Sequence, residues 1–306
     1  MYDLKRLGLI STRLNCFQTV ARTGSIRKAA EMLNLAPSAV SRTIAALEQD
    51  LKTPLFERGK QRIRLTSAGE LLVYHAKSVA TELIQACRAI DDLQGLKHGT
   101  VTISVIESVA QGFLANVLDE FWSSHPDVAV HVLICTSKQA MDAVADGTSD
   151  LGLAFDEGPA STSRSLAVVK LAIGAVVTPK HRLARRKSIR LADMAGEPLI
   201  LPDNNLNLGV NAHEFFSRLA ESSRARVSTN SIRMMIDLAT RGSGIGFQTK
   251  IGLTEEIARK RVVFVPFNEP RVPTRNLRLF CRDRRQLSMA ASQFGNALAK
   301  RISAFK

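Results

Sequence analysis

The sequence predicts a multi-domain α+β protein with an N-terminal helical unit, one long connecting helix and a C-terminal α/β region. Within the first 51 residues, apolar side chains recur at the spacing of an amphipathic helix. A 3.5-residue repeat follows between residues 72 and 93, and strand and helix patterns alternate from residue 100 onward. With 306 residues, of which 45% are hydrophobic and 23% charged, the chain is long enough for two or three folded units.

Positive charge gathers at the two ends of the chain, whose formal net charge is +14. Residues 1–66 hold 12 basic and 5 acidic side chains, and residues 269–306 hold 9 basic and 2 acidic ones. A basic N-terminal unit suits binding to a phosphate backbone. The C-terminal arginine cluster is interpreted as a solvated rim, with a second phosphate-binding surface as the alternative. Its members are Arg278, Arg282, Arg284 and Arg285.

Three short helices are predicted within the first 51 residues. The first covers residues 11–25, the second 26–33 and the third 37–51. In each of them apolar residues recur three and four positions apart, which directs one face toward a common core. Gly24 suits the end of the first helix, and Pro37 suits the start of the third because a first turn needs no proline N–H.

Polar side chains occupy the start of the third helix. A helix-turn-helix with such a face fits the DNA major groove, where arginine pairs bidentately with guanine. The predicted helix-turn-helix spans residues 26–45, and an ordinary three-helix bundle without a ligand is the alternative. The residues expected to face DNA are Ser25, Pro37, Ser38, Ser41, Arg42 and Thr43.

A basic hairpin is predicted directly after the three helices. Its alternating charged and apolar residues around Gly59 predict a wing that lies along phosphates or in the minor groove. Phosphate contacts position a protein on DNA, whereas the third helix specifies the sequence. Residues 9–66 are therefore interpreted as a winged helix-turn-helix domain. The wing cations are Arg58, Lys60, Arg62 and Arg64.

About 60 residues of this unit closely resemble the N-terminal domain of LysR-type transcriptional regulators. The turn Ala36-Pro37-Ser38 departs from the Ser-Gln-Pro of many members, so base preference is not carried over. The resemblance implies binding to an interrupted inverted repeat in double-stranded DNA, by a homodimer or by a tetramer built as a dimer of dimers. The resemblance is also compatible with a contact with RNA polymerase. The matching runs include Gly24-Ser25-Ile26, Pro37-Ser38-Ala39-Val40-Ser41, Pro54-Leu55-Phe56-Glu57-Arg58 and Ala68-Gly69.

A long helix is predicted over residues 67–95. Its apolar residues alternate spacings of four and three for three heptads, which is typical of a coiled coil. At about 1.5 Å per residue the helix is about 40 Å long, too long to be buried against one small domain. We therefore expect it to join two copies of the chain. The predicted seam consists of Leu72, Ala76, Val79, Leu83, Ala86 and Ile90.

Strand and helix patterns alternate through residues 99–306. Repeated strand–helix–strand units predict a parallel sheet with right-handed crossovers. The predicted strands are 101–105, 128–134, 151–155, 168–177, 199–201, 245–247 and 262–265, and the helices are 113–122, 138–145, 213–220, 232–240 and 287–302.

This region resembles, more loosely, the effector-binding domain of the same family, a two-lobed α/β fold similar to type 2 periplasmic binding proteins. The resemblance implies one lobe from about 99–167 and 269–306, a second from about 168–268, and two strands crossing between them. A small-molecule effector is expected in the cleft between the lobes. The matching runs include His125-Pro126-Asp127-Val128, Asp150-Leu151-Gly152-Leu153-Ala154 and Gly242-Ser243-Gly244-Ile245-Gly246.

Three strand-to-helix corners carry capping residues whose free N–H groups and hydroxyls suit a polar or carboxylate metabolite, although each alone is explained as a helix N-cap. Glu107 disfavours an anion unless it is paired, and both Arg233 and a ligand ammonium stay open as its partner. Together with the resemblance, the corners give the expected effector contacts. These are Glu107, Ser108, Cys135, Thr136, Ser137, Phe155, Pro202, Asn230, Ser231 and Gly244.

No catalytic, metal-binding or cofactor-binding pattern stands out. The six histidines never lie three or four apart, and the four cysteines form no Cys-x-x-Cys pair. We therefore expect no enzyme activity, no metal and no cofactor. The alternatives are an enzyme built on the α/β region, a nucleoid-type architectural DNA binder without a ligand, and a redox sensor acting through Cys135. The lack of a long apolar run or signal peptide predicts a cytoplasmic protein without a membrane partner.

Overall fold

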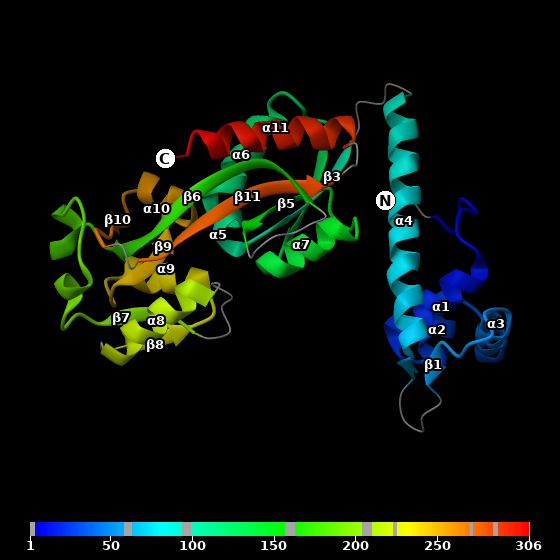
Figure 1. The fold of residues 1–306 in the computed structure, drawn as a ribbon. Coiled ribbons are helices and arrows are strands. Elements are labelled where there is room, and N and C mark those ends of the chain that lie inside the picture. Colours follow the sequence, from blue (N-terminus) through cyan, green and yellow to red (C-terminus); the bar gives the residue numbers. More distant parts are fainter. Residues whose placement is uncertain are drawn as a thin grey trace. The chain divides into compact units, whose positions relative to one another are not determined.

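The computed structural model divides into two compact units, Met1–Leu96 and Lys97–Lys306 (Figure 1). Within the described ranges, no helix combines the length and apolar character that a membrane span requires. The described residues are 4–57, 63–93, 99–156, 163–203, 210–222, 225–269, 272–283 and 287–305.

Three helices of the first unit close around one apolar core. Ser25 begins the second helix, because its hydroxyl accepts a hydrogen bond from the Lys28 N–H at 3.4 Å. Gly24 ends the first helix with a left-handed φ of 63°, as the sequence predicts. The helices are α1 (Thr12–Thr23), α2 (Ile26–Leu33) and α3 (Pro37–Asp50). The buried residues at the centre include Phe17, Val20, Ala29, Ala30 and Val40.

A hairpin and a long helix complete the first unit. The hairpin pairs β1 (Phe56–Glu57) with β2 (Arg64–Leu65) in antiparallel register. The long helix is α4 (Ser67–Leu93). It begins where the Thr66 hydroxyl accepts a hydrogen bond from the Gly69 N–H at 3.1 Å, so Thr66 caps this helix.

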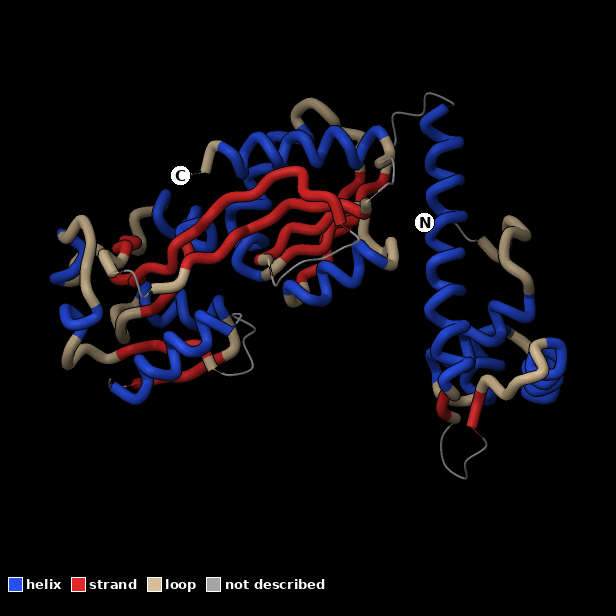
Figure 2. Tube along the Cα trace, viewed as in Figure 1, coloured by secondary structure: helices blue, strands red, loops and turns tan. Residues whose placement is uncertain are grey.

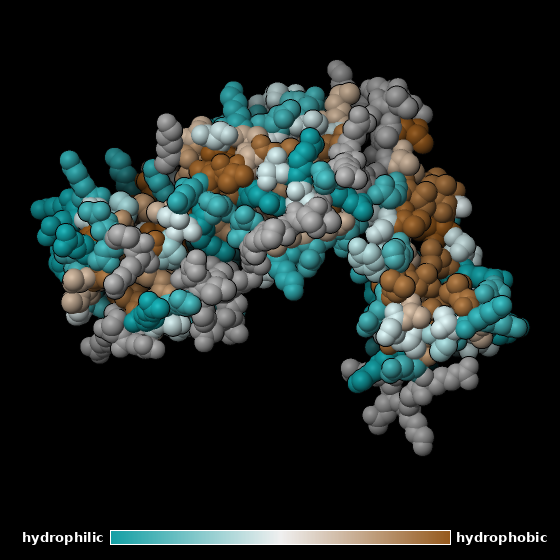
Figure 3. All heavy atoms as spheres, viewed as in Figure 1, coloured by the Kyte–Doolittle hydropathy of each residue, from teal (hydrophilic) through white to brown (hydrophobic). Residues whose placement is uncertain are grey.

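The predicted seam along α4 is only partly free for a partner. Ala76 is 3% exposed and Leu72 packs on the core of its own unit. This corrects the prediction for Ala76, because the first turns of α4 cover the helical core, whereas Leu72 is half-buried. Farther along, Val79 is 50% exposed and Ile90 is 53% exposed. Apolar atoms gather over α4 in the space-filling view (Figure 3).

The second unit contains a seven-stranded sheet. Its strands are β3 (Thr100–Val105), β4 (Ala129–Ile134), β5 (Leu151–Phe155), β6 (Ser163–Val177), β9 (Gly246–Thr249), β10 (Val263–Pro266) and β11 (Thr274–Arg282). They lie in the order β10-β6-β11-β5-β3-β4, with β9 also paired to β6. The pairs of β3 with β4 and β5 are parallel, and the other pairs are antiparallel.

The sheet is therefore mixed, which corrects the predicted parallel sheet. One cause is β11, which comes from the C-terminal segment and lies between β5 and β6, antiparallel to both. The other is β6, which also pairs antiparallel with β9 and β10. The sequence did not reveal β11 because charged residues interrupt its apolar pattern. The interrupting residues are Arg275, Arg278 and Arg282.

Arg278 does not lie on a solvated rim, which corrects a second prediction. Its side chain is 12% exposed and lies 3.8 Å from the Asp156 carboxylate. The guanidinium also lies 5.0 Å from the ring centroid of Phe280. The Arg278 charge therefore contacts neighbouring residues of the fold instead of extending into solvent. Two other members of the predicted rim lie outside the described residues, namely Arg284 and Arg285.

The second unit has two lobes that β6 connects, with one buried apolar cluster in the first lobe and two in the second. Leu171 of β6 belongs to the cluster of the first lobe and Ile173 to a cluster of the second, and β6 runs beside β11 along the unit (Figure 2). The strand β8 (Ala225–Thr229) was not predicted, because Val227 is its one large apolar residue. The helices of the first lobe are α5 (Glu107–Val109), the π-helical η1 (Ala110–Leu114), α6 (Ala115–Trp122), α7 (Ser137–Ala145) and α11 (Met289–Ser303). The second lobe adds β7 (Leu199–Pro202), β8 (Ala225–Thr229), α8 (Val210–Ser222), α9 (Ile232–Thr240), the 3₁₀-helical η4 (Lys250–Leu253) and α10 (Thr254–Ala258).

Candidate functional site

The start of α3 presents polar side chains on a helix that is anchored from beneath. Val40 is fully buried and Ile44 is 6% exposed, and both belong to the core of the first unit. A helix with one buried and one polar face presents the polar face as a rigid surface. Four of the predicted DNA-facing residues are exposed there, namely Pro37, Ser38, Ser41 and Arg42.

Two other predicted DNA-facing residues are engaged within the chain. Ser25 caps α2, and the Thr43 hydroxyl donates a hydrogen bond to the Ala39 carbonyl at 2.9 Å. Arg42 differs from them, because no ion-pair partner lies beside it in the part of the chain that the structure describes. Its guanidinium is therefore free to bind an external group.

Glu48, which was not predicted as a site residue, holds the hairpin to the end of α3. Its Oε1 accepts hydrogen bonds from the Leu55 N–H at 2.7 Å and the Phe56 N–H at 3.1 Å. Since β1 begins at Phe56, these bonds fix the hairpin relative to α3. Arg64 is exposed on β2. The other predicted wing cations lie outside the described residues, namely Arg58, Lys60 and Arg62.

A cavity of about 300 Å³ lies between the two lobes of the second unit. Its size falls at the lower end of the range for small-molecule sites, about 300–1,000 Å³. The first lobe contributes the ends of β3 and β4 with the following helix starts, and the second contributes β7, β9 and the start of α9. Eight predicted effector contacts line it, namely Glu107, Ser108, Cys135, Thr136, Ser137, Phe155, Pro202 and Asn230.

Two predicted contacts do not line the cavity. Ser231 caps α9 by accepting a hydrogen bond from the Met234 N–H at 3.2 Å. Gly244 packs so closely on Pro198 that an added Cβ would lie 2.6 Å from its carbonyl oxygen, so this glycine serves the fold. Much of the cavity wall was not predicted from the sequence, because its residues carry side chains typical of an ordinary core. They include Ile106, Ile134, Ile173, Phe216, Ile232, Met235 and Phe247.

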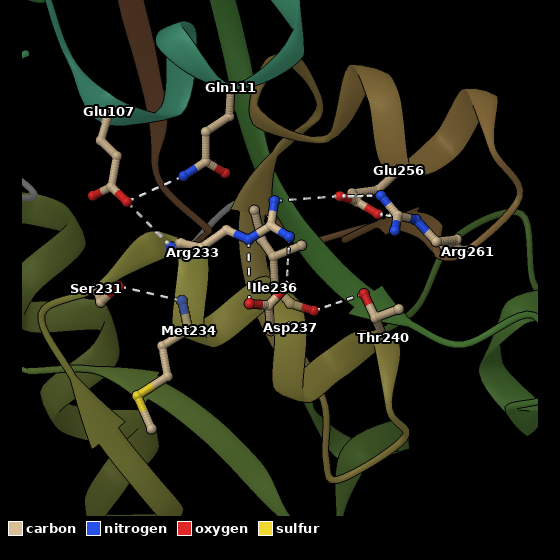
Figure 4. Close-up of polar contacts among 10 residues, drawn as sticks. All are labelled: Glu107, Gln111, Ser231, Arg233, Met234, Ile236, Asp237, Thr240, Glu256 and Arg261. Carbon is tan, nitrogen blue, oxygen red and sulfur yellow. Dashed lines mark hydrogen bonds and ion pairs between the residues drawn. The ribbon is translucent and has the colours of Figure 1, made fainter.

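Glu107 lies at the start of α5 and reaches across to the second lobe (Figure 4). Its Oε1 accepts a hydrogen bond from the Gln111 side chain at 3.1 Å and from the backbone N–H of Arg233 at 3.3 Å. The guanidinium of Arg233 turns instead to Asp237, 3.0 Å away. Arg233 therefore does not pair with Glu107 through its charge, and that open alternative is resolved.

Glu256 holds the Arg233 guanidinium in this position (Figure 4). The Glu256 side chain is 8% exposed and lies 3.8 Å from Arg233. Arg261 pairs with the same carboxylate at 2.6 Å. A buried carboxylate between two arginines is compensated, so this cluster fixes α9 against the neighbouring α10.

Cys135 is expected to react slowly with thiol reagents. Burial raises the pKa of the Cys135 thiol, and this outweighs a hydrogen bond with Ser104 that lowers it. Because the thiolate is the reactive form, iodoacetamide should alkylate Cys135 more slowly than a free thiol at pH 7.5. Mass spectrometry after timed alkylation measures the rate, with urea-unfolded protein as the control. Alkylation as fast as that of the unfolded chain would contradict this expectation.

Comparisons with known proteins match both units. The family described as "Bacterial regulatory helix-turn-helix protein, lysR family" matches residues 11–70, and "LysR substrate binding domain" matches residues 94–303. The "Probable RuBisCO transcriptional regulator" of Trichormus variabilis is 26% identical over 292 residues, which cover 94% of this chain and 86% of that protein. The "HTH-type transcriptional activator CmpR" of Synechocystis is 29% identical over 217 residues, which cover 70% and 71%.

Solved structures share the fold at lower identity. The crystal structure of CbnR, a LysR family transcriptional regulator, has a TM-score of 0.66 at 17% identity and covers 95% of this chain and 98% of its own. A full-length OxyR variant of Pseudomonas aeruginosa has a TM-score of 0.63 at 18% identity, covering 95% and 93%. Among the described residues, no group of three His, Cys, Asp or Glu side chains is placed to hold a metal ion.

Proposed function

The chain belongs to the LysR family of transcriptional regulators, DNA-binding proteins with an effector-binding domain, and from this premise we propose how its residues divide the work. Residues 9–66 bind operator DNA, residues 67–95 join two copies, and residues 99–306 bind an effector. The observation that carries the proposal is the anchored α3, with exposed Ser38, Ser41 and Arg42 on its outer face.

The first turns of α3 enter the major groove and read bases. Arg42 has no ion-pair partner among the described residues, and it donates two hydrogen bonds to a guanine. Ser38 and Ser41 contact neighbouring bases or phosphates. Pro37, Ser25 and Thr43 lie at the edge of this face and contribute further contacts to the DNA. The wing follows the phosphate backbone through Arg64 together with Arg58, Lys60 and Arg62.

Arg42→Ala and Arg64→Ala should have different consequences for DNA binding. Arg42→Ala should lose about 1–3 kcal/mol of discrimination at one base position, because a bidentate guanine contact is removed. Arg64→Ala should weaken binding to all sequences alike and reduce the salt slope by about 0.9, the effect of one lost phosphate contact. Affinities for an operator and its single-base variants, measured from about 50 to 200 mM salt, separate the two effects. An Arg42→Ala variant with unchanged base preference would overturn the proposed reading helix.

Two copies associate along α4 from Val79 onward, through Val79, Leu83, Ala86 and Ile90. Val79 and Ile90 are large apolar residues left exposed in this part of the helix, and Leu83 is half-buried. A two-fold pair presents two α3 helices to the halves of an inverted repeat. Two such dimers forming a tetramer, and a contact with RNA polymerase, extend the proposal.

The cavity between the lobes holds a small-molecule effector that changes the spacing of paired DNA-binding units. A nucleoid-type binder needs no such cavity, so eight predicted contacts around one cavity favour the regulator. We infer that the protein acts by binding its effector and not by catalysing a reaction. We also infer that it acts in the cytoplasm, together with the DNA. The architectural alternative would be favoured if none of the ligands that stabilise the full-length protein changed its binding to the operator.

A further inference from the structure

The wall of the cavity suits a ligand with an apolar body. Nine of the residues that line it carry apolar side chains, and they come from both lobes. Contact with such a wall removes apolar ligand surface from water, which favours binding. The nine are Ile106, Ile134, Phe155, Ile173, Pro202, Phe216, Ile232, Met235 and Phe247.

Several polar groups in the wall are already bonded within the protein. Gln139 Oε1 accepts hydrogen bonds from the Thr136 N–H at 3.0 Å and from the Thr136 hydroxyl at 3.1 Å. Gln248 Oε1 accepts hydrogen bonds from the N–H and the hydroxyl of Thr249, at 2.8 and 3.2 Å. The Arg275 guanidinium lies 4.0 Å from the Phe155 ring centroid. The Thr136 hydroxyl and the two amide oxygens therefore already have partners, and the Arg275 guanidinium lies over an aromatic ring.

The first two residues of α5 are different. Ser108 is 1% exposed, yet its Oγ has no hydrogen-bond partner among the described residues. Beside it, Glu107 uses only Oε1 for its bonds to Gln111 and Arg233, and Oε2 has no partner in the described part of the chain. A buried hydroxyl without a partner costs free energy that a bound donor or acceptor recovers.

Glu107 also lacks a cation. No lysine, arginine or histidine of the described chain pairs with its carboxylate within 4.0 Å. Arg233 supplies only its backbone N–H, because its guanidinium is committed to Asp237 and Glu256 (Figure 4). A carboxylate beside an apolar cavity is stabilised by an opposite charge and repels a like charge.

We propose that the effector is a cationic amphiphile: a protonated amine, or another nitrogen cation, on an apolar body. The cation donates hydrogen bonds to Glu107 Oε2 and Ser108 Oγ, while the body contacts the apolar wall. A ligand carboxylate at this corner would face the charge of Glu107, so the carboxylate metabolite considered from the sequence is disfavoured at this corner of the cavity. This inference rests on the proposed effector cavity and names the chemical class that the cavity selects.

Calorimetric titration of the full-length protein with matched amine and acid probes tests the inference. The pairs are hexylamine with hexanoate, and 2-phenylethylamine with 3-phenylpropanoate. At pH 7 at least one amine should bind about ten-fold or more tightly than its matched acid, because only the amine completes an ion pair with Glu107. Glu107→Gln should remove most of this difference, and Ser108→Ala should weaken amine binding about three-fold or more through one lost hydrogen bond.

Glu120→Gln is the matched control, because it also removes one carboxylate from the first lobe. Glu120 lies on α6, is 59% exposed and pairs with Arg301 outside the cavity lining, so amine binding should stay unchanged. If Glu107→Gln lowers the melting temperature of the free protein, Ser108→Ala gives the deciding result. Acids that bind while amines do not would overturn the inference and leave the effector cavity standing. If neither series binds, both the inferred ligand class and the proposed effector cavity are contradicted. Intact operator binding by the same protein would leave the proposal on DNA reading unaffected.

Discussion

Replacing Val79 and Ile90 by glutamate should convert the protein to a monomer and lower its affinity for a two-half-site operator by about 10²–10⁴-fold. Both side chains are half exposed on α4, beyond the turns that cover the helical core. Paired glutamates facing each other across a two-fold axis would repel, and the apolar contact would be lost. Because a dimer binds its second half-site intramolecularly, the loss of pairing removes that gain in affinity.

Sedimentation and operator titration of the same samples measure the two parts of this effect. Lys77→Glu is the control, because Lys77 is exposed on the opposite side of α4 from Val79. It should leave the sedimentation coefficient unchanged. A doubly substituted protein that stays dimeric would show that another surface joins the two copies.

Phe17→Ala should destabilise the first unit by about 3–5 kcal/mol and abolish operator binding at physiological temperature. Phe17 is fully buried, and its ring centroid lies 5.4 Å from that of Phe56 in the hairpin. The substitution therefore opens a cavity where α1, α3 and the hairpin meet. Because the second unit has its own apolar cores, its unfolding should be unchanged.

Urea titration followed by circular dichroism measures this effect. Met32→Ala is the control, because Met32 is 58% exposed on α2 and should change stability by no more than about 0.5 kcal/mol. Equal stability of the Phe17→Ala and Met32→Ala proteins would contradict the assigned core of the first unit.

The first unit was the easier part to predict from the sequence. Its helices rest on short-range patterns: Ser25 and Gly24 mark helix ends, and Pro37 begins α3 where the sequence places it. Glu48 escaped notice because its partners are backbone N–H groups seven and eight residues away, a contact that no local pattern announces.

The sheet and the cavity wall were harder, because long-range contacts determine them. Arg278 reads as a surface residue, yet Asp156 and Phe280 hold it within the sheet. Phe216 and Phe247 read as core residues, and they are core residues that also line the cavity. The corner residues could be proposed because capping chemistry is local. The partner of Glu107 was left open from the sequence, because the backbone N–H and the guanidinium of Arg233 contact different groups.

The most direct test of the reading helix is methylation interference on an operator fragment with wild-type and Arg42→Ala proteins. The N7 atom of guanine faces the major groove, and a methyl group there blocks the hydrogen bond that arginine makes. We expect wild-type binding to be blocked by methylation at one guanine in each half-site, and this interference to disappear with Arg42→Ala. Interference that persists unchanged in Arg42→Ala, or that never occurs in the wild type, would contradict the account.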